Sequence, residues 1–173
     1  MTERTLPIAP KTLIQAALLA ACFGVAYAHT IAKLVGDWST DPNFSHGFLI
    51  PPIAVYMLWQ KRKELAESRL EPSLWGLVAL AAGMALHIVG NVGAELFTMR
   101  FSILVTIFGL TLYLFGWEVT RKALIPILYL LLMIPIPAIL WNKIAFPMQL
   151  FASSLAADAI RLLSIPILRE GNV

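Results

Sequence analysis

Residues 74–92 read LWGLVALAAGMALHIVGNV, and these 19 residues contain no Asp, Glu, Lys or Arg. At a rise of about 1.5 Å per residue, a helix of this length covers roughly the 30 Å hydrocarbon core of a bilayer. Backbone polar groups find no water in that core, so only a segment that satisfies its own hydrogen bonds can cross it. The stretch therefore predicts a membrane-spanning α-helix.

Similar apolar runs lie on both sides of this stretch, at about 12–34, 101–117 and 123–140. Each is long enough to span a bilayer. A shorter run, 48–59, covers only about 20 Å, so its helix is expected to begin within residues 43–47 or to be tilted. The sequence predicts an all-α, polytopic transmembrane bundle of about five spans. A cleaved leader is the alternative for the first run, but the many apolar runs after it favour a retained span.

The composition agrees with a membrane protein and excludes a soluble globular domain. Hydrophobic residues make up 59% of the 173 residues and charged residues only 13%, whereas soluble domains carry about 25% charged residues. The net charge of +3 is not gathered in a basic stripe, so no nucleic-acid partner is expected. The single cysteine, Cys22, excludes an internal disulfide and a multi-thiolate zinc site. We expect no metal and no cofactor.

The distribution of basic residues predicts the orientation in the membrane. Eight Lys and Arg residues lie in the N-terminal tail and in the loops 60–73 and 117–123, whereas the opposite loops contain only Lys33 and Arg100. Positive charge is retained on the cytoplasmic side. The N-terminus and the solvated loop 60–73 are therefore predicted to be cytoplasmic, and residues 37–47 to face outward.

The last helical stretch, 144–163, differs from the other runs because it carries a polar stripe. At 100° per residue, Lys143, Ser154, Asp158 and Arg161 share one narrow face. Asp158 and Arg161 are three residues apart, close enough to pair. This sixth helix is predicted to lie in the interface or to line a polar cavity. An ordinary sixth span with one internal ion pair is the alternative.

Three motifs occur in order across about 135 residues. The first is WSTDPNFSHGFLIPPIAVYMLW at 38–59. The second, within 132–163, contains Pro-Ile-Pro at 135–137, Pro-Met-Gln-Leu at 147–150 and Ala-Ser at 152–153. The third is Arg-Glu-Gly-Asn-Val at 169–173. Together they resemble the exosortase family, the bacterial relatives of archaeosortases.

The resemblance implies a cysteine transpeptidase or protease of the bacterial cytoplasmic membrane. Its partners would be the lipid bilayer and the C-terminal sorting signal of exported proteins, of PEP-CTERM type: a Pro-Glu-Pro-like motif, an apolar span and a basic cluster. The cargo would be associated with exopolysaccharide and envelope export. In the family a Cys, an Arg and a His act together, and they lie beyond the Arg-Glu-Gly-Asn-Val motif. Because this chain stops at Val173, no catalytic residue is carried over. The expectation is an N-terminal domain, 1–173, that is catalytically incomplete.

Six residues are candidates for contact with the substrate. Asn43 and His46 lie in the polar loop before the second run, where they either cap the following helix or dock the sorting motif. A catalytic triad there is disfavoured, because Ser45 is the immediate neighbour of His46. Asp158 and Arg161 would supply inward polar groups. The remaining pair, Arg169 and Glu170, either forms a surface ion pair or positions the segment after it.

Two other functions stay open at the level of sequence. A small transporter or channel subunit would explain the prolines in the fifth run and the polar stripe on the last helix. A purely structural membrane partner is also compatible with the composition. His87, with Asn91 one turn later on the same face, is expected to be a packed or hydrogen-bonded polar residue.

Overall fold

The structure is a computed structural model that describes residues 10–162, and the chain divides into two compact units, Met1–Pro135 and Ile136–Val173. Each unit is described by itself. The described part consists of helices and the turns and loops that connect them, with one isolated bridge between Glu71 and Gly116. The helices of unit 1 are α1 (Pro10–Thr40), η1 (Pro42–Phe48), α2 (Ile50–Gln60), α3 (Arg62–Ala66), α4 (Trp75–Val92), α5 (Leu96–Phe115), α6 (Trp117–Tyr129) and η2 (Leu130–Met133). Unit 2 contains α7 (Ala138–Leu162). The predicted all-α helical membrane fold is confirmed.

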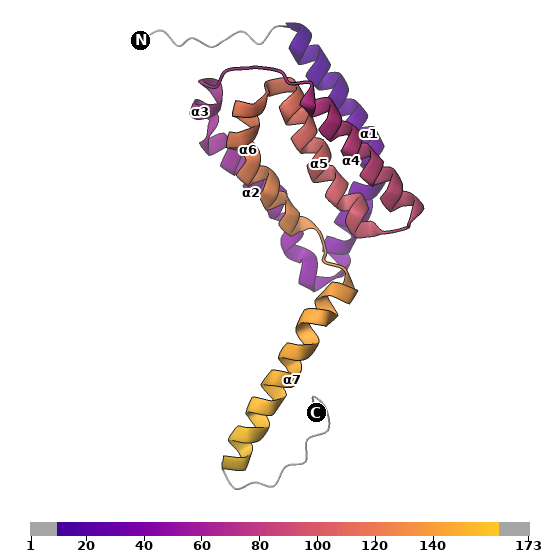
Figure 1. Cartoon of the computed structure of the whole chain (residues 1–173), viewed down its shortest axis with the longest axis vertical. Helices are drawn as coiled ribbons and strands as arrows, with labels where there is room; N and C mark the ends of the chain where they lie inside the picture. The colour runs from indigo at the N-terminus through magenta and orange to yellow at the C-terminus, as the bar shows by residue number, and fades with distance from the viewer. Residues whose placement is uncertain (1–9, 163–173) are drawn as a thin grey trace. The chain divides into compact units, whose positions relative to one another are not determined.

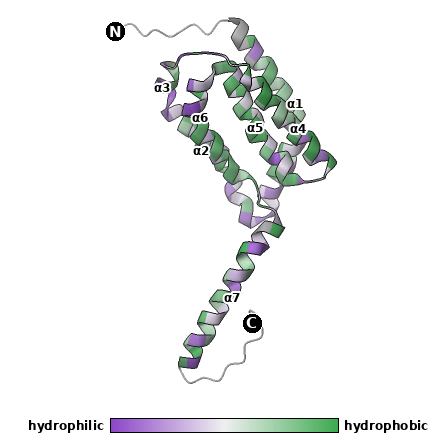
Figure 2. Ribbon diagram, in the orientation of Figure 1, coloured by the Kyte–Doolittle hydropathy of each residue, from purple (hydrophilic) through white to green (hydrophobic). Residues whose placement is uncertain are grey.

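Within unit 1, the helices α1, α4 and α5 pack side by side, and α2 lies beside α6 (Figure 1). Three helices in the described part are long and apolar enough to cross a membrane: Ala17–Thr40, Trp75–Val92 and Leu96–Phe115. Figure 2 shows these helices as predominantly hydrophobic. The chain reverses direction between successive long helices (Figure 1). The connections between them therefore lie alternately at the two ends of unit 1.

Of the five expected runs, only 74–92 keeps its boundaries to within one residue. The helix α1 continues to Thr40, beyond the expected end at 34, and α5 begins at Leu96, before the expected start at 101. The other two runs differ more. The second run forms α2, which has 11 residues and begins at Ile50 after the separate 3-10 helix η1. The fifth run was expected at 123–140, but its helix begins at Trp117 and ends with η2 at Met133. Pro135 and Pro137 explain the end, because proline lacks an N–H and disfavours a helical residue before it.

The helix α7 begins six residues earlier than predicted. It starts at Ala138, directly after Pro137, and continues through Pro147 to Leu162. The predicted range of 144–163 is therefore too short at its N-terminal end. Residues 123–140 are therefore divided among the end of α6, η2, a non-helical segment and the start of α7, and do not form the single span that was expected.

The α4–α5 hairpin is the closest helix pair of unit 1. Gly76, Gly83 and Gly90 recur every seven residues on α4, and all three are buried. A Cβ atom on Gly76 would overlap the backbone of Tyr113, and one on Gly90 would lie 2.7 Å from the backbone nitrogen of Met99. Small residues let membrane helices approach this closely. The heptad spacing is visible in the sequence but was not among the predictions.

A buried polar cluster lies between α1, α4 and α5. Tyr27 is fully buried, and its hydroxyl makes hydrogen bonds with Ser102 (3.1 Å) and Thr106 (2.8 Å). The ring of His87 packs against Tyr27 with a centroid distance of 4.5 Å, which agrees with the packed role expected for this histidine. The hydroxyls satisfy one another where no lipid group could.

Candidate functional site at the Trp38 rim

The candidate site is the end of unit 1 where α1 meets η1, α5 and η2; we name it the Trp38 rim and define it as residues 37–48, 100 and 133–134. The helix α1 ends at Thr40, and Asp41 caps η1 by accepting hydrogen bonds from the backbone N–H and the side-chain amide of Asn43, both at 2.9 Å. Pro42 follows at the first helical position, where its missing N–H costs least. The polar loop is therefore a rigid helical turn.

Trp38 is the buried centre of the rim. Its indole nitrogen donates a hydrogen bond to the backbone oxygen of Met133 at 2.9 Å. Gly47 lies directly on the indole ring, and a Cβ atom there would overlap it. Phe48 adds an edge-on aromatic contact at 5.3 Å. One side chain thus fixes the end of α1, the turn η1 and the point where α6 gives way to Pro135.

An ion pair joins α1 to α5 in the same rim. Arg100 is 3% exposed, and its guanidinium lies 2.6 Å from the carboxylate of Asp37, whose side chain is 41% exposed. A buried cation without its partner would be strongly destabilising. Glu95, at the nearby start of α5, accepts hydrogen bonds from the N–H groups of Phe97 and Thr98. Hydrogen bonds from Thr98 are the main reason that the pKa of Glu95 is lowered.

Asn43 and His46 both have exposed side chains on η1. Neither caps α2, because Leu49 takes that position without a side-chain hydrogen bond and Asn43 bonds to Asp41 instead. Ser45 donates to the backbone oxygen of Pro42 at 2.9 Å, so it is not oriented toward His46 as a nucleophile would be. The rim exposes these two polar side chains on the turn η1, which packs through Gly47 against Trp38.

The other candidate residues lie in unit 2 or outside the described range. Asp158 and Arg161 pair on α7 at 3.2 Å, as predicted, but both side chains are more than half exposed. Ser154 donates to the backbone oxygen of Phe151. Arg169 and Glu170 lie outside the described residues. Within residues 10–162, no three His, Cys, Asp or Glu side chains gather as a metal site would require.

The opposite end of unit 1 is more ordered than the solvated loop predicted at 60–73. The ammonium of Lys122 donates to the backbone oxygen of Glu64, to the hydroxyl of Ser68 and to the carboxylate of Glu118, at 3.0, 2.8 and 3.0 Å. Ser68 is buried, and the N–H of Arg69 donates to Glu118 at 3.1 Å. The hydrogen bond from Lys122, followed by that from Arg69, lowers the pKa of Glu118. The loop is a folded cap that is fastened to α6.

These features define a multi-pass helical membrane protein. At one end of unit 1 the Trp38 rim is joined by a buried hydrogen bond and an ion pair, and at the other end lies a charged cap. The model of the transmembrane exosortase family (Exosortase_EpsH) matches residues 38–173, and the chain belongs to this family. The match begins at Trp38, the centre of the rim. No curated protein and no solved structure is significantly similar to the chain. The resemblance seen in the sequence is confirmed.

Proposed function

We propose that the chain is the N-terminal membrane scaffold of an exosortase-like cysteine transpeptidase or protease that processes PEP-CTERM-type sorting signals of exported proteins. Membership of the family implies a membrane cysteine transpeptidase at the family level. The observation that carries the finer proposal is the Trp38 rim. The Asn-Phe-Ser-His-Gly segment is fixed through Trp38 and Met133 and keeps Asn43 and His46 exposed.

A fixed turn with exposed polar groups suits recognition of an extended peptide. Asn43 offers an amide oxygen and the imidazole of His46 offers a donor and an acceptor. Groups held on a packed support lose little entropy when a ligand binds. We propose that Asn43 and His46 dock the sorting motif next to the membrane. Asp158 and Arg161 on α7, with Arg169 and Glu170, remain proposed substrate contacts.

The one cysteine thiol within residues 1–173, that of Cys22, is not at the Trp38 rim. Cys22 precedes Trp38 by 16 residues on the same helix, a rise of about 24 Å. A nucleophile must reach the scissile carbonyl that the rim would hold. We therefore propose that residues 1–173 supply the scaffold and the docking surface but not the nucleophile, and that they do not cleave a sorting signal by themselves.

We further propose that the protein lies in a bacterial inner membrane with its N-terminus and the 60–73 cap in the cytoplasm. The support is the concentration of Lys and Arg on that side of the chain. The Trp38 rim then faces outward, where an exported protein carrying a sorting signal would arrive.

The test uses a bacterium that encodes this chain and a secreted reporter with a PEP-CTERM-type tail. Deleting the gene should leave the reporter at precursor size, and restoring the intact gene should restore processing. Asn43→Ala and His46→Ala in the restored gene should slow processing, whereas Ser45→Ala on the same turn should not. The immunoblot of the reporter is read together with the abundance of each variant in the membrane fraction.

Two results would contradict the proposal. Unchanged processing in the deletion strain would remove the assigned activity. Cleavage of the reporter by purified residues 1–173 would show that the scaffold holds its own nucleophile. Flux of ions or solutes through liposomes containing the chain would favour the transporter alternative.

A further inference from the structure

A depression of about 480 Å³ lies at the end of unit 1 opposite the Trp38 rim. Its two walls are the segment before α4 and the start of α6, and the backbone holds them together through the bridge between Glu71 and Gly116. Gly116 has a φ of +84°, and a Cβ atom there would overlap the backbone of Glu71. The lining residues are Glu71, Pro72, Ser73, Trp117, Glu118 and Arg121. The backbone of the two walls is therefore held together at this point.

The position of the depression along the membrane normal follows from the ends of the two spans beside it. The span α4 begins at Trp75, just after one wall, and the span α5 ends at Phe115, just before the other. The lining residues thus lie where both helices leave the hydrocarbon, at the level of the lipid headgroups. Trp75 and Trp117 are 74% and 62% exposed, as tryptophans of an interfacial belt are.

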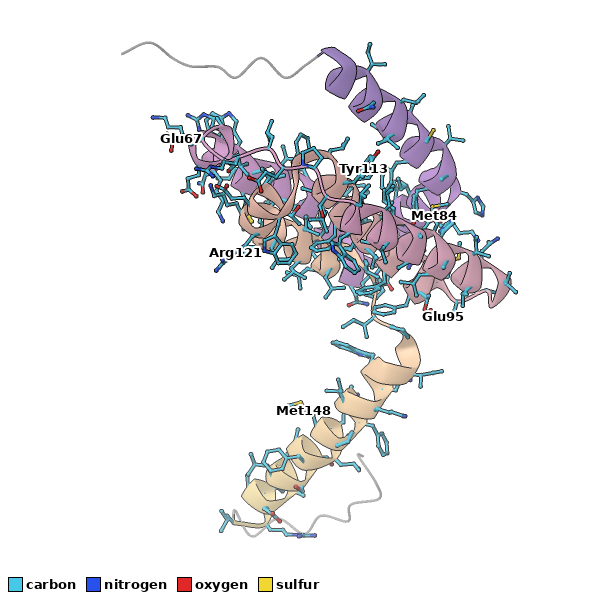
Figure 3. All side chains as sticks on the ribbon, turned by 45° about the horizontal axis from the view of Figure 1, so that its top comes forward. Glu67, Met84, Glu95, Tyr113, Arg121 and Met148 are labelled. Atoms are coloured by element: carbon cyan, nitrogen blue, oxygen red, sulfur yellow. The ribbon has the colours of Figure 1, made fainter. Side chains whose placement is uncertain are left out.

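The depression contains charges of both signs. Arg121 is exposed, and within residues 10–162 neither its guanidinium nor the exposed carboxylate of Glu71 forms a hydrogen bond or an ion pair. Glu118 adds a second carboxylate, which is already held by Lys122 and by the N–H of Arg69. Figure 3 labels both Arg121 and Glu67 of the cap toward the same end of unit 1, with the Arg121 side chain extending away from Glu67. A purely anionic ligand would meet two carboxylates, and a purely cationic one would meet Arg121.

We propose that this depression binds the zwitterionic headgroup of an aminophospholipid, such as phosphatidylethanolamine. The phosphate would be bound by Arg121 with help from the hydroxyl of Ser73, and the primary ammonium by Glu71 and Glu118. Arginine suits phosphate because its guanidinium offers several N–H donors. The volume lies within the range of small-molecule sites.

Two related lipids test whether the site recognises both groups of the phosphatidylethanolamine headgroup. Phosphatidylglycerol shares the phosphate but carries no ammonium for the carboxylates. Phosphatidylcholine has a quaternary ammonium, which cannot donate a hydrogen bond. The site therefore requires both the phosphate and a primary ammonium. This lipid site does not rest on the proposed peptidase role.

The experiment is native mass spectrometry of the full chain, released from detergent and titrated with the three lipids carrying identical acyl chains. The wild type should retain phosphatidylethanolamine about tenfold better than either other lipid, which corresponds to about one charge-assisted hydrogen bond. Arg121→Gln should weaken retention of phosphatidylethanolamine. Glu71→Gln should reduce the preference for phosphatidylethanolamine over phosphatidylcholine.

The matched controls are Lys63→Gln and Glu67→Gln, which remove the same charges from exposed positions outside the depression. Both should bind like the wild type. Thermal unfolding of each variant shows that the fold is kept. Equal retention of all three lipids, stronger retention of phosphatidylglycerol, or unchanged binding in both Arg121→Gln and Glu71→Gln would each overturn the proposal. So would tighter binding of a basic peptide than of any lipid.

Discussion

Trp38 shows how much of the rim depends on single residues. Its indole is enclosed by Gly47 from the same motif and by the backbone of Met133, 95 residues later in the chain. A motif can mark Trp38 and Gly47 as a pair within one segment. It cannot show that the glycine is needed because an indole occupies the space of its side chain.

Gly47→Ala tests this packing. The added Cβ atom would displace the indole and break its hydrogen bond to Met133, so we expect a loss of about 2–4 kcal/mol in the free energy of unfolding. Gly24→Ala is the matched control, because no atom lies within 4 Å of a Cβ there and alanine favours the helix. Unfolding in detergent, followed by tryptophan fluorescence, measures both. Equal stability of the two variants would contradict the packing argument.

Glu95 gives a prediction about pH. Its pKa is lowered from 4.5 in the folded chain, chiefly by the Thr98 side chain and then by the N–H groups of Thr98 and Phe97. A lowered pKa means that the carboxylate stabilises the fold above about pH 4.5 and that this contribution is lost as the pH falls through the folded value. The wild type should therefore exceed Glu95→Gln in melting temperature at about pH 7 and lose that advantage near pH 3. A difference in melting temperature that stays constant with pH would contradict the role of Glu95 as the N-cap of α5.

The candidate site could be predicted from the sequence only in part. Asn43 and His46 were identified because they belong to a motif and lie beside a span. Their roles as caps of α2 were wrong, since Asp41 already fixes the turn and Leu49 begins the helix. The partner of Asp37, Arg100, is 63 residues away, and no local pattern reports such a pair.

At the scale of elements, apolar length located α4 to within one residue, because nothing interrupts residues 75–92. The same criterion failed for the fifth run, where Gly116 and Pro135 set the ends of the α6–η2 segment. Hydropathy reports which solvent a segment can enter. The start and end of a helix depend on caps, prolines and positive φ angles, which carry little hydropathy signal.

The heptad of glycines on α4 leads to a prediction for the helix pair. Gly76→Ala should push α4 away from the backbone of Tyr113 and reduce the stability of unit 1 by about 1–3 kcal/mol. Ala82→Leu adds more volume to an exposed position of the same helix and should change stability by less than about 0.5 kcal/mol. Resistance to unfolding by a denaturing detergent measures both variants. A larger effect of Ala82→Leu would place the contact surface of α4 on another face.

At the scale of the whole molecule, the two ends of unit 1 have different chemistry. The Trp38 rim joins its elements with an indole, a glycine and one buried ion pair. The charged cap joins residues 61–73 to α6 through Lys122 and Glu118. Six Lys and Arg residues lie in this cap and the start of α6. This asymmetry is the physical basis of the proposed orientation, since it retains the cap on the cytoplasmic side.

Single cysteines can decide the orientation, because Cys22 is the only native one. In a Cys22→Ala background, Ser45→Cys places a thiol on the exposed turn of the rim and Lys63→Cys places one on the exposed cap. A membrane-impermeant maleimide should label Ser45→Cys in intact spheroplasts and Lys63→Cys only after the membrane is permeabilised. The reverse pattern would invert the orientation and remove the rim from the side where exported proteins arrive. Labelling of both positions in intact spheroplasts would mean that unit 1 does not separate its rim from its cap across the bilayer, and the docking role of Asn43 and His46 would lose its physical basis.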